Sequence, residues 1–464
     1  MRIVARREWH PEAGTVVDWV PTARTINAAK GAPPHPVPVS FLQRDHITGV
    51  LAARAEDRPH RAYTCAAVQV PGRFDESRLT AALTSFLRDH PGLRCVFRAD
   101  GEQLTRHLIV AGDVELTTEH PVVADRDIAA HIDARLARSA VFDSFPAVVF
   151  GAVVRHDGFD LYFGIDHAFG DGSSQAIGIA DILDRYHGGA GFRSGSHIDH
   201  VATEYALAGQ IAERDAEVAE WADALRPTDG RLPGFALDLG LEQTAAGPVP
   251  QRVRIRRAQL ADAEDTEAIA AVAAAAGTGF TAAVYAALAL ADRELGGRDH
   301  FATATVLSTR GSAEHQLAQG WYCNFAPVAF PVQGATLREV IGDAAAGLSR
   351  ARRLSALPAH AVLATLIGTG RVDPSVAGSP QMVSYLDFRW FPAQRELSDA
   401  VLFTGEGRTR NASQWISRDH DGLWIATQCP DNPVAGAAVT RYFDTVRAHL
   451  TAALTAPVAI GLGA

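Results

Sequence analysis

The apolar positions in the first half of the chain follow two patterns, and together they predict alternating strands and helices. Short apolar and β-branched stretches bounded by turn residues are expected to form strands. These stretches are 62–70, 93–97 and a hairpin over 147–166 with its turn at 156–158. Apolar residues spaced as in a helix begin after Ser40, after Asp75 and at Ser173, and each of these stretches predicts a helix. The segment before residue 37 is rich in proline and is expected to be irregular.

The second half of the chain continues this mixture of strands and helices. Loop-like residues at 188–200 and 227–250 enclose a helical stretch at roughly 203–225. The strands expected after it are 253–255, 301–307, 383–387 and 422–427, and the helices are 264–276, 281–295, 337–354 and 434–454. Strands and helices that alternate in this way predict an α/β protein.

Composition excludes some classes of protein. The chain has 464 residues, of which 47% are hydrophobic and 21% charged, and these proportions exclude general disorder. This length predicts two or three packed units. The formal net charge of −10 argues against a nucleic-acid partner. Lys30 is the only lysine, so any basic patch must be built from arginine.

The sequence shows no sign of export or of a membrane span. The N-terminus carries charges but lacks the apolar stretch of a signal peptide. The longest apolar run, 280–291, is shorter than the roughly 20 residues that cross a bilayer, and we expect it to form a core helix. The cysteines lie far apart in sequence and are expected to be reduced; they are Cys65, Cys95, Cys323 and Cys429. We therefore expect a cytoplasmic protein.

The segment from Phe163 to Gly172 carries the most informative chemistry. A buried strand leads to His167, and a tight turn then leads to Asp171 and the start of a helix. Strand alternation places Asp166 and His167 on opposite faces, so Asp166 cannot simply orient its neighbour. Histidine suits a general base near neutral pH, and backbone N–H groups at the start of a helix suit a developing negative charge.

Two other interpretations of this segment remain open on spacing alone. The first is a capped turn in which His167 is a satisfied structural histidine, because short motifs of this kind often occur by chance. The second is a metal pair, which lacks a third histidine, cysteine or carboxylate at ligand spacing. Ser173 and Ser174 can likewise serve as helix caps rather than as donors to an oxyanion.

Several further stretches share one resemblance with this segment. The stretches are 165–172, with an H-x-x-x-D-G core; 40–44, which opens a helix; 90–97, which reads H-P-x-L-R-x-x-F; 319–327, which contains G-x-x-x-N; and 429–433 before the last helix. With these stretches, the chain resembles the condensation-domain superfamily of acyltransferases related to chloramphenicol acetyltransferase, whose motif at 165–172 is H-H-x-x-x-D-G, and especially its mycobacterial polyketide-associated members. The stretches occur in the family's order from about residue 38 to 450.

The resemblance implies a mixed α/β sandwich fold. Two lobes similar to chloramphenicol acetyltransferase are expected to form a V, with the active site in a tunnel between them. Residues 1–195 are expected to form the N-terminal lobe, 196–250 a crossover or linker, and 251–464 the C-terminal lobe.

The resemblance also implies roles for individual residues. His167 matches the catalytic histidine, and Asp171 matches the structural aspartate that pairs with an arginine of the second lobe, for which Arg310 is the candidate. Gly172 belongs to the same motif. Asp166 departs from the family, because it replaces the first histidine of the doublet, and this favours the ester-forming relatives. Further supporting residues are Ser173 and Asn324.

The expected reaction is acyl transfer in natural-product biosynthesis. The resemblance implies that an acyl or aminoacyl thioester on the phosphopantetheine arm of a carrier protein, or on coenzyme A, reacts with an alcohol to form an ester. No bound cofactor or metal is expected. Two rivals remain open: amide formation with an amine acceptor, and a catalytically silent module that recruits partners.

Overall fold

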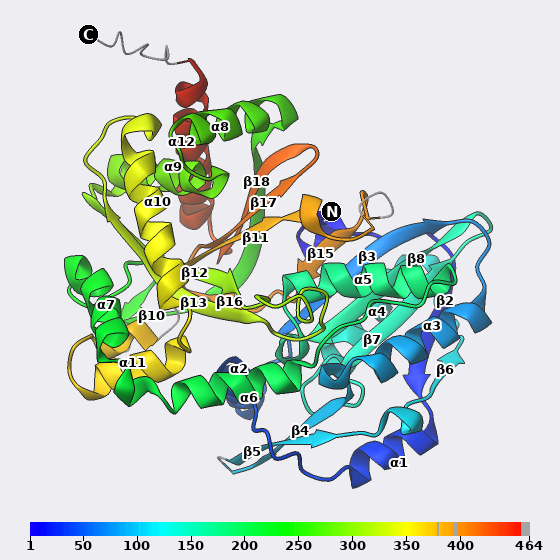
Figure 1. The fold of residues 1–464 in the computed structure, drawn as a ribbon. Coiled ribbons are helices and arrows are strands. Elements are labelled where there is room, and N and C mark those ends of the chain that lie inside the picture. The colour runs from blue at the N-terminus through cyan, green and yellow to red at the C-terminus, as the bar shows by residue number, and fades with distance from the viewer. Residues whose placement is uncertain (102, 246, 378–379, 394–396, 456–464) are drawn as a thin grey trace. The chain divides into compact units, whose positions relative to one another are not determined.

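The computed structural model describes residues 1–101, 103–245, 247–377, 380–393 and 397–455, which fold into two compact units (Figure 1). Unit 1 comprises Met1–Leu207, Ser308–Cys323 and Trp390–Gly407. Unit 2 comprises Ala208–Leu307, Asn324–Arg389 and the chain from Arg408 onward. The units are therefore not the continuous stretches 1–195 and 251–464. Two segments from the second half of the chain pack into unit 1, and no separate linker unit forms.

Unit 1 is built on a seven-stranded sheet with the strand order β1-β15-β3-β8-β7-β2-β6. Its strands are β1 (Arg2–Ile3), β15 (Val401–Thr404), β3 (Tyr63–Pro71), β8 (Gly158–Asp166), β7 (Val148–Val154), β2 (Thr15–Pro21) and β6 (Leu116–Glu119). All neighbours are antiparallel except β1 and β15. A separate ribbon joins β4 (Cys95–Asp100) to β5 (Gln103–Leu108). The hairpin expected over 147–166 is confirmed as β7 and β8.

Helices α3 (Glu76–Asp89) and α5 (Gly172–Tyr186) pack on one face of this sheet, and α4 (Ile128–Ser139) packs on the other. Unit 1 also contains α1 (Ala23–Gly31), α2 (Phe41–Ala55) and α6 (His197–Ala208). Phe163 of β8 packs against Phe86 of α3 and against Gly178 of α5, while its neighbour Tyr162 joins Leu136 of α4 in the core on the opposite face. Successive side chains along β8 point to opposite faces of the sheet and thus pack against different helices.

Unit 2 is built on a second seven-stranded sheet, with the order β13-β12-β14-β17-β18-β11-β16. Its strands are β13 (Cys323–Pro331), β12 (His300–Ser308), β14 (Met382–Asp387), β17 (Ser413–Asp419), β18 (Gly422–Pro430), β11 (Gln251–Asp262) and β16 (Arg408–Thr409). Its helices are α7 (Asp215–Leu225), α8 (Ala263–Ala275), α9 (Phe280–Gly296), α10 (Leu337–Leu354), α11 (Ala359–Gly368) and α12 (Pro433–Thr455). The short strands β9 (Gln243–Thr244) and β10 (Gly247–Pro248) form a small ribbon.

The structure corrects the sequence-based expectation in three places. The segment before residue 37 is not irregular, because it contains β1, β2 and α1. The stretch 203–225 is interrupted and belongs to two helices, α6 and α7. The short strand expected at 253–255 lies near the start of β11, which runs for 12 residues and pairs with β18.

The apolar run 280–291 forms the interior of α9, and its residues from Ala282 to Ala291 are buried in the core of unit 2. Among the described residues, no single helix is long and apolar enough to cross a membrane. The pair α8 and α9 passes that test of length and composition together, but the two helices are bent by 98° relative to each other. All four cysteines are free thiols, and Cys65, Cys95 and Cys429 are buried.

Candidate active site

The segment 166–172, here called the histidine turn, joins β8 to α5 in unit 1. β8 ends at Asp166, whose carboxylate accepts a hydrogen bond from the Ala168 N–H at 2.8 Å and so starts one turn of 3₁₀ helix, His167–Phe169. Gly170 follows, and a Cβ there would lie 2.6 Å from the Ile165 side chain and 2.9 Å from that of Ser174. Only glycine leaves room for the chain to fold back so tightly. The turn therefore presents His167 at the end of a buried strand.

His167 is partly exposed, and its ring stacks on the indole of Trp321. The ring centroids are 4.1 Å apart and the planes differ by 27°. Nδ1 is buried without a hydrogen-bond partner among the described residues. Burial lowers the pKa of His167, and the nearby His46 lowers it further. His167 is therefore neutral at pH 7, with Nε2 left as its available nitrogen.

Asp171 and Arg310 form a buried bidentate ion pair. The Arg310 guanidinium donates to the two carboxylate oxygens of Asp171 at 2.7 and 3.1 Å. Asp171 also accepts hydrogen bonds from the backbone N–H groups of Ser174 and Tyr322 and from the Cys323 thiol. Burial raises the pKa of Asp171, but Arg310, followed by the Ser174 N–H and the Cys323 thiol, lowers it more, so this pKa lies below its ordinary value. The pairing expected from the sequence is present, but Arg310 lies in a segment of unit 1 and not in a C-terminal lobe.

The segment 308–323 packs closely on the first turn of α5. The Ser174 hydroxyl accepts a hydrogen bond from Arg310 at 2.8 Å and contacts the backbone of Gly320. Gly320 has a φ of +153°, and a Cβ there would lie 2.5 Å from the side chain of His197. Glycine is therefore required at this position. His197 Nε2 in turn donates to the carbonyl of Trp321 at 3.1 Å, which fixes the backbone that carries the indole.

Helix α2 is also tied to the histidine turn. Ser40 and Gln43 form a capping box at the start of α2, as the sequence motif predicts. The Gln43 amide then donates to the backbone carbonyl of Ala168 at 2.8 Å. Gln43 Oε1 accepts hydrogen bonds from both the Ser40 N–H and the Arg106 guanidinium, each at 2.9 Å. The polar residues of the opening helix therefore position the turn that carries His167.

Asp166 is fully buried, and its hydrogen bonds in the described part of the chain go to His46 and the Ala168 N–H rather than to the His167 side chain. Its Oδ1 accepts a hydrogen bond from His46 Nε2 of α2 at 2.8 Å, and its Oδ2 lies 3.4 Å from His60 Nε2. The opposite orientation of Asp166 and His167 expected from strand alternation is thus present. Sequence reasoning did not identify His46 or Trp321 as site residues, although both lie in or beside the recognised motifs.

The predicted site residues fall into two groups. Unit 1 brings together His167, Asp171, Gly172, Arg310, Asp166 and Ser173. Ser173 does not cap the helix: Asp171 is the N-cap, and Gly172 and Ser173 supply the first N–H groups of α5. Asn324 belongs to unit 2, where its amide donates to the carbonyls of Ser355 and Leu357 and its Oδ1 accepts from the Ala359 N–H. Asn324 thus fixes the connection from α10 to α11.

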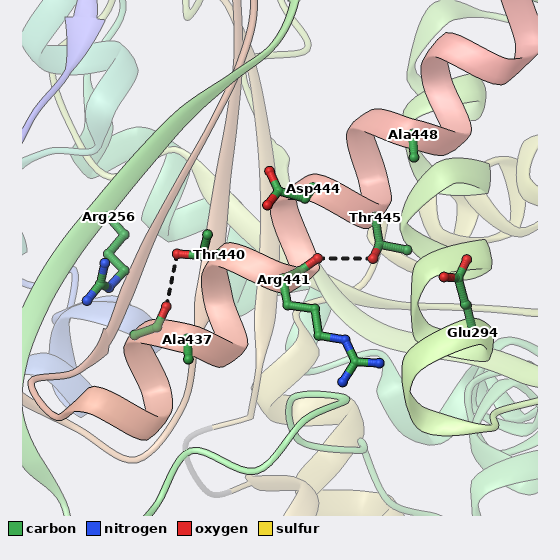
Figure 2. A pocket seen from close by; sticks show the side chains of 9 residues that line it. Arg256, Glu294, Ala437, Thr440, Arg441, Asp444, Thr445 and Ala448 are labelled. Carbon is green, nitrogen blue, oxygen red and sulfur yellow. Dashed lines mark hydrogen bonds between the residues drawn. The ribbon is translucent and has the colours of Figure 1, made fainter.

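Within the described part of the chain, no three histidine, cysteine, aspartate or glutamate side chains are grouped so that they could hold a metal ion. A surface groove on unit 2 lies between Arg256 of β11, Glu294 of α9 and one side of α12 (Figure 2). Both of its acidic residues have partners: Glu294 lies 3.0 Å from His449 Nε2, and Asp444 forms an ion pair with Arg447. None of the predicted site residues lines this groove.

Several histidines around the site have lowered pKa values and should therefore reduce the stability of the folded chain in acid. Burial lowers the pKa of His200 to about 4, and burial also lowers those of His167 and His197. The unfolded chain therefore binds more protons than the folded chain between pH 6.5 and 4, so the free energy of unfolding should fall as the pH is lowered through that range. Urea unfolding at a series of pH values measures this dependence. His200→Gln should flatten it, and equal slopes for both proteins would contradict the prediction.

Comparison with known proteins identifies the relatives of the chain. Residues 35–382 match the model of the Condensation domain family. The 2'-acyl-2-O-sulfo-trehalose (hydroxy)phthioceranyltransferase PapA1 of Mycobacterium tuberculosis is 27% identical over 96% of this chain and 88% of its own length. The trehalose-2-sulfate acyltransferase PapA2 of the same species is 26% identical over 96% of each chain.

Solved structures agree on the fold. The structure of a PapA2 acyl transferase superposes with a TM-score of 0.87 at 23% identity, covering 98% of this chain and all of its own. The X-domain from teicoplanin biosynthesis superposes with a TM-score of 0.70 at 18% identity, covering 90% of this chain and 96% of its own. The mixed α/β fold expected from the resemblance is thereby confirmed. The chain belongs to the condensation-domain family and is an acyltransferase.

Proposed function

We propose that this acyltransferase moves an acyl group from a phosphopantetheine thioester to a hydroxyl group of a sugar of the trehalose type, forming an ester. The relatives support this acceptor class, since PapA1 and PapA2 are named for acyl transfer to sulfated trehalose. The donor is carried either by a carrier protein or by coenzyme A, and the phosphopantetheine is part of the substrate. The observation that carries the proposal is the neutral, oriented imidazole of His167.

His167 acts as the general base in this proposal. Nε2 accepts the proton of the attacking hydroxyl as the oxygen forms its bond to the thioester carbonyl carbon. The lowered pKa of His167 keeps Nε2 unprotonated at neutral pH, which a base requires. The stack on Trp321 restricts rotation of the imidazole, so its orientation is set before the acceptor binds. The carbon–sulfur bond then breaks, and the thiolate leaves with the proton returned by His167.

The N-terminus of α5 is the proposed oxyanion site. The N–H groups of Gly172 and Ser173 have no carbonyl to bind within the helix because they belong to its first turn. They are therefore free to donate to the oxygen of the tetrahedral intermediate. The carboxylate of Asp171 would oppose a negative charge here, but Arg310 neutralises it through the bidentate pair. The buried ion pair thus keeps the helix terminus favourable for an anion.

A paired acceptor assay distinguishes ester formation from its closest rival. Acyl-loaded carrier protein and acyl-coenzyme A are each offered with trehalose and with 2-amino-2-deoxytrehalose, and the products are identified by mass spectrometry. We expect an ester of trehalose with at least one donor. Amide from the amino sugar without ester from trehalose would replace the proposal by amide formation. No acyl product with any pair would favour the recruitment module.

A further inference from the structure

We propose that Asp166 orients His167 indirectly, through His46 and Trp321, and that His46 is a positioning residue for acyl transfer. This inference rests on the proposed role of His167 as the base. Asp166 directly precedes His167 in the sequence but points to the other side of the strand. The route runs from the carboxylate to the imidazole of His46, then to the indole of Trp321 and from there to His167. We call these four side chains the positioning relay.

The first step of the relay fixes the ring of His46. Asp166 has no exposed surface, and its Oδ1 accepts hydrogen bonds from both the Ala168 N–H and His46 Nε2 at 2.8 Å. The Ala168 bond belongs to the histidine turn itself, so this carboxylate cannot rotate without disturbing that turn. A buried carboxylate that lost its donor would remain uncompensated, so His46 is held firmly in place.

The backbone of His46 is fixed to the same turn. His46 lies one helical turn after Gln43, and Gln43 donates to the Ala168 carbonyl at 2.8 Å. Ala168 is therefore linked to His46 in two ways: its carbonyl binds Gln43 on the same helix, and its N–H binds Asp166, which in turn binds the His46 imidazole. A helix anchored twice at one residue leaves the His46 ring little freedom relative to His167.

The second step fixes the indole of Trp321. The His46 ring stands nearly perpendicular to the indole, at 84°, with the ring centroids 5.8 Å apart. His197 holds the Trp321 carbonyl at 3.1 Å, and the next residue, Tyr322, donates its N–H to Asp171 at 3.0 Å. With the backbone fixed on both sides, the remaining freedom of Trp321 is rotation of its side chain. The His46 ring limits that rotation by edge-to-face packing.

The third step is the stack of Trp321 on His167, with centroids 4.1 Å apart. His46 does not replace this contact, because its own ring centroid lies 6.0 Å from that of His167. If His46 is lost, the Trp321 indole can rotate, and the His167 imidazole no longer stacks on a ring that fixes its orientation. A reacting group displaced by about 1 Å can reduce the rate about 100-fold, so the effect should appear in kcat rather than in KM.

The relay also affects the ionisation of His167. The ionisable groups that interact with His46 are Asp166 of β8, His60 and His167. Arg54, near the end of α2, interacts with Asp166 and His60. His46 lowers the pKa of His167, after the larger contribution of burial. Replacing His46 with glutamine removes this effect and should therefore move the acid limb of the kcat/KM profile to higher pH. A purely structural role for His46 would leave this limb unchanged.

Two substitutions separate the parts of the relay. His46→Gln retains an N–H donor for Asp166 but lacks the ring, and His46→Phe retains a ring but lacks the donor. We expect both to reduce kcat about 10-fold or more, with KM changed less than about threefold. The double variant His46→Gln/Trp321→Leu should lose no more activity than the worse single variant, because the two residues act in one relay.

The matched control is His131→Gln. His131 donates to another buried carboxylate of unit 1, Asp18, at 2.7 Å, but does not contact Trp321 or His167 among the interactions described. His131→Gln should keep both kcat and KM within about threefold of the wild-type values. Full kcat and an unchanged acid limb in folded His46→Gln, or additive losses in the double variant, would overturn the relay. If wild-type enzyme forms no ester, the proposed function fails instead.

Discussion

His167→Ala is expected to reduce kcat/KM for acyl transfer about 1,000-fold, because loss of a positioned general base removes about 10²–10⁴-fold of rate and the orientation of the nucleophile is lost with it. The fold should survive, since the imidazole is neutral and leaves no charged partner behind. The measurement is the initial rate of thiol release with thioester donor and sugar acceptor, beside the melting temperature.

The control for this substitution is His156→Ala, which removes a side chain that is 94% exposed in the turn of the β7–β8 hairpin. It should retain the wild-type rate. Turnover of His167→Ala within about tenfold of the wild type would contradict the role of base, because even a modest general base supplies more than that. It would then favour a positioning role or the recruitment module.

Arg310→Met is expected to destabilise the folded chain by about 3–5 kcal/mol, because it leaves the Asp171 carboxylate buried without its counter-ion. Both side chains are more than 90% buried, so water cannot replace the guanidinium. Asp171→Ala should also destabilise the protein more than His167→Ala does, because it leaves Arg310, the Ser174 N–H and the Tyr322 N–H without their acceptor. Urea unfolding at pH 7 measures all three variants.

Arg54→Met is the matched control for the buried pair. Arg54 makes the same bidentate contact to Asp143, at 2.8 and 3.1 Å, but its side chain is 51% exposed. Exposed pairs contribute less than about 1 kcal/mol, so this variant should unfold close to the wild type. The double variant Asp171→Ala/Arg310→Met should recover part of the lost stability. Equal losses for Arg54→Met and Arg310→Met would show that burial of the Asp171–Arg310 pair has no special effect.

The local elements of the fold follow closely from the sequence. The hairpin β7–β8 combines two apolar stretches with a His-Asp-Gly turn, and α10 occupies the expected range 337–354. The prediction for the N-terminal segment is wrong, because prolines do not interrupt its elements. Pro21 is the last residue of β2 and lies beyond the part of that strand that pairs with β7, so its missing N–H costs no bond on that side. Periodicity therefore identifies elements well where composition and spacing agree.

Contacts between residues far apart in the sequence could be predicted only where the resemblance to a known family implied them. The pairing of Asp171 with Arg310 came from the family resemblance, whereas the packing of 308–323 into unit 1 has no signal in periodicity. Strand alternation correctly separated Asp166 from His167. It could not indicate that His46, 120 positions earlier, would bind Asp166, because that contact depends on how α2 packs against the turn. The geometry around His167 thus required the structure.

In the proposed reaction, His167 promotes transfer of an acyl group from a thioester to a sugar hydroxyl. A single time course tests this reaction when free thiol and acylated trehalose are quantified together, for the wild type and for His167→Ala. We expect one molecule of trehalose ester for each thiol released by the wild type, and a common loss of both in the variant. Thiol release that yields free acid instead of ester, or ester formation that persists in His167→Ala, would contradict the proposed reaction.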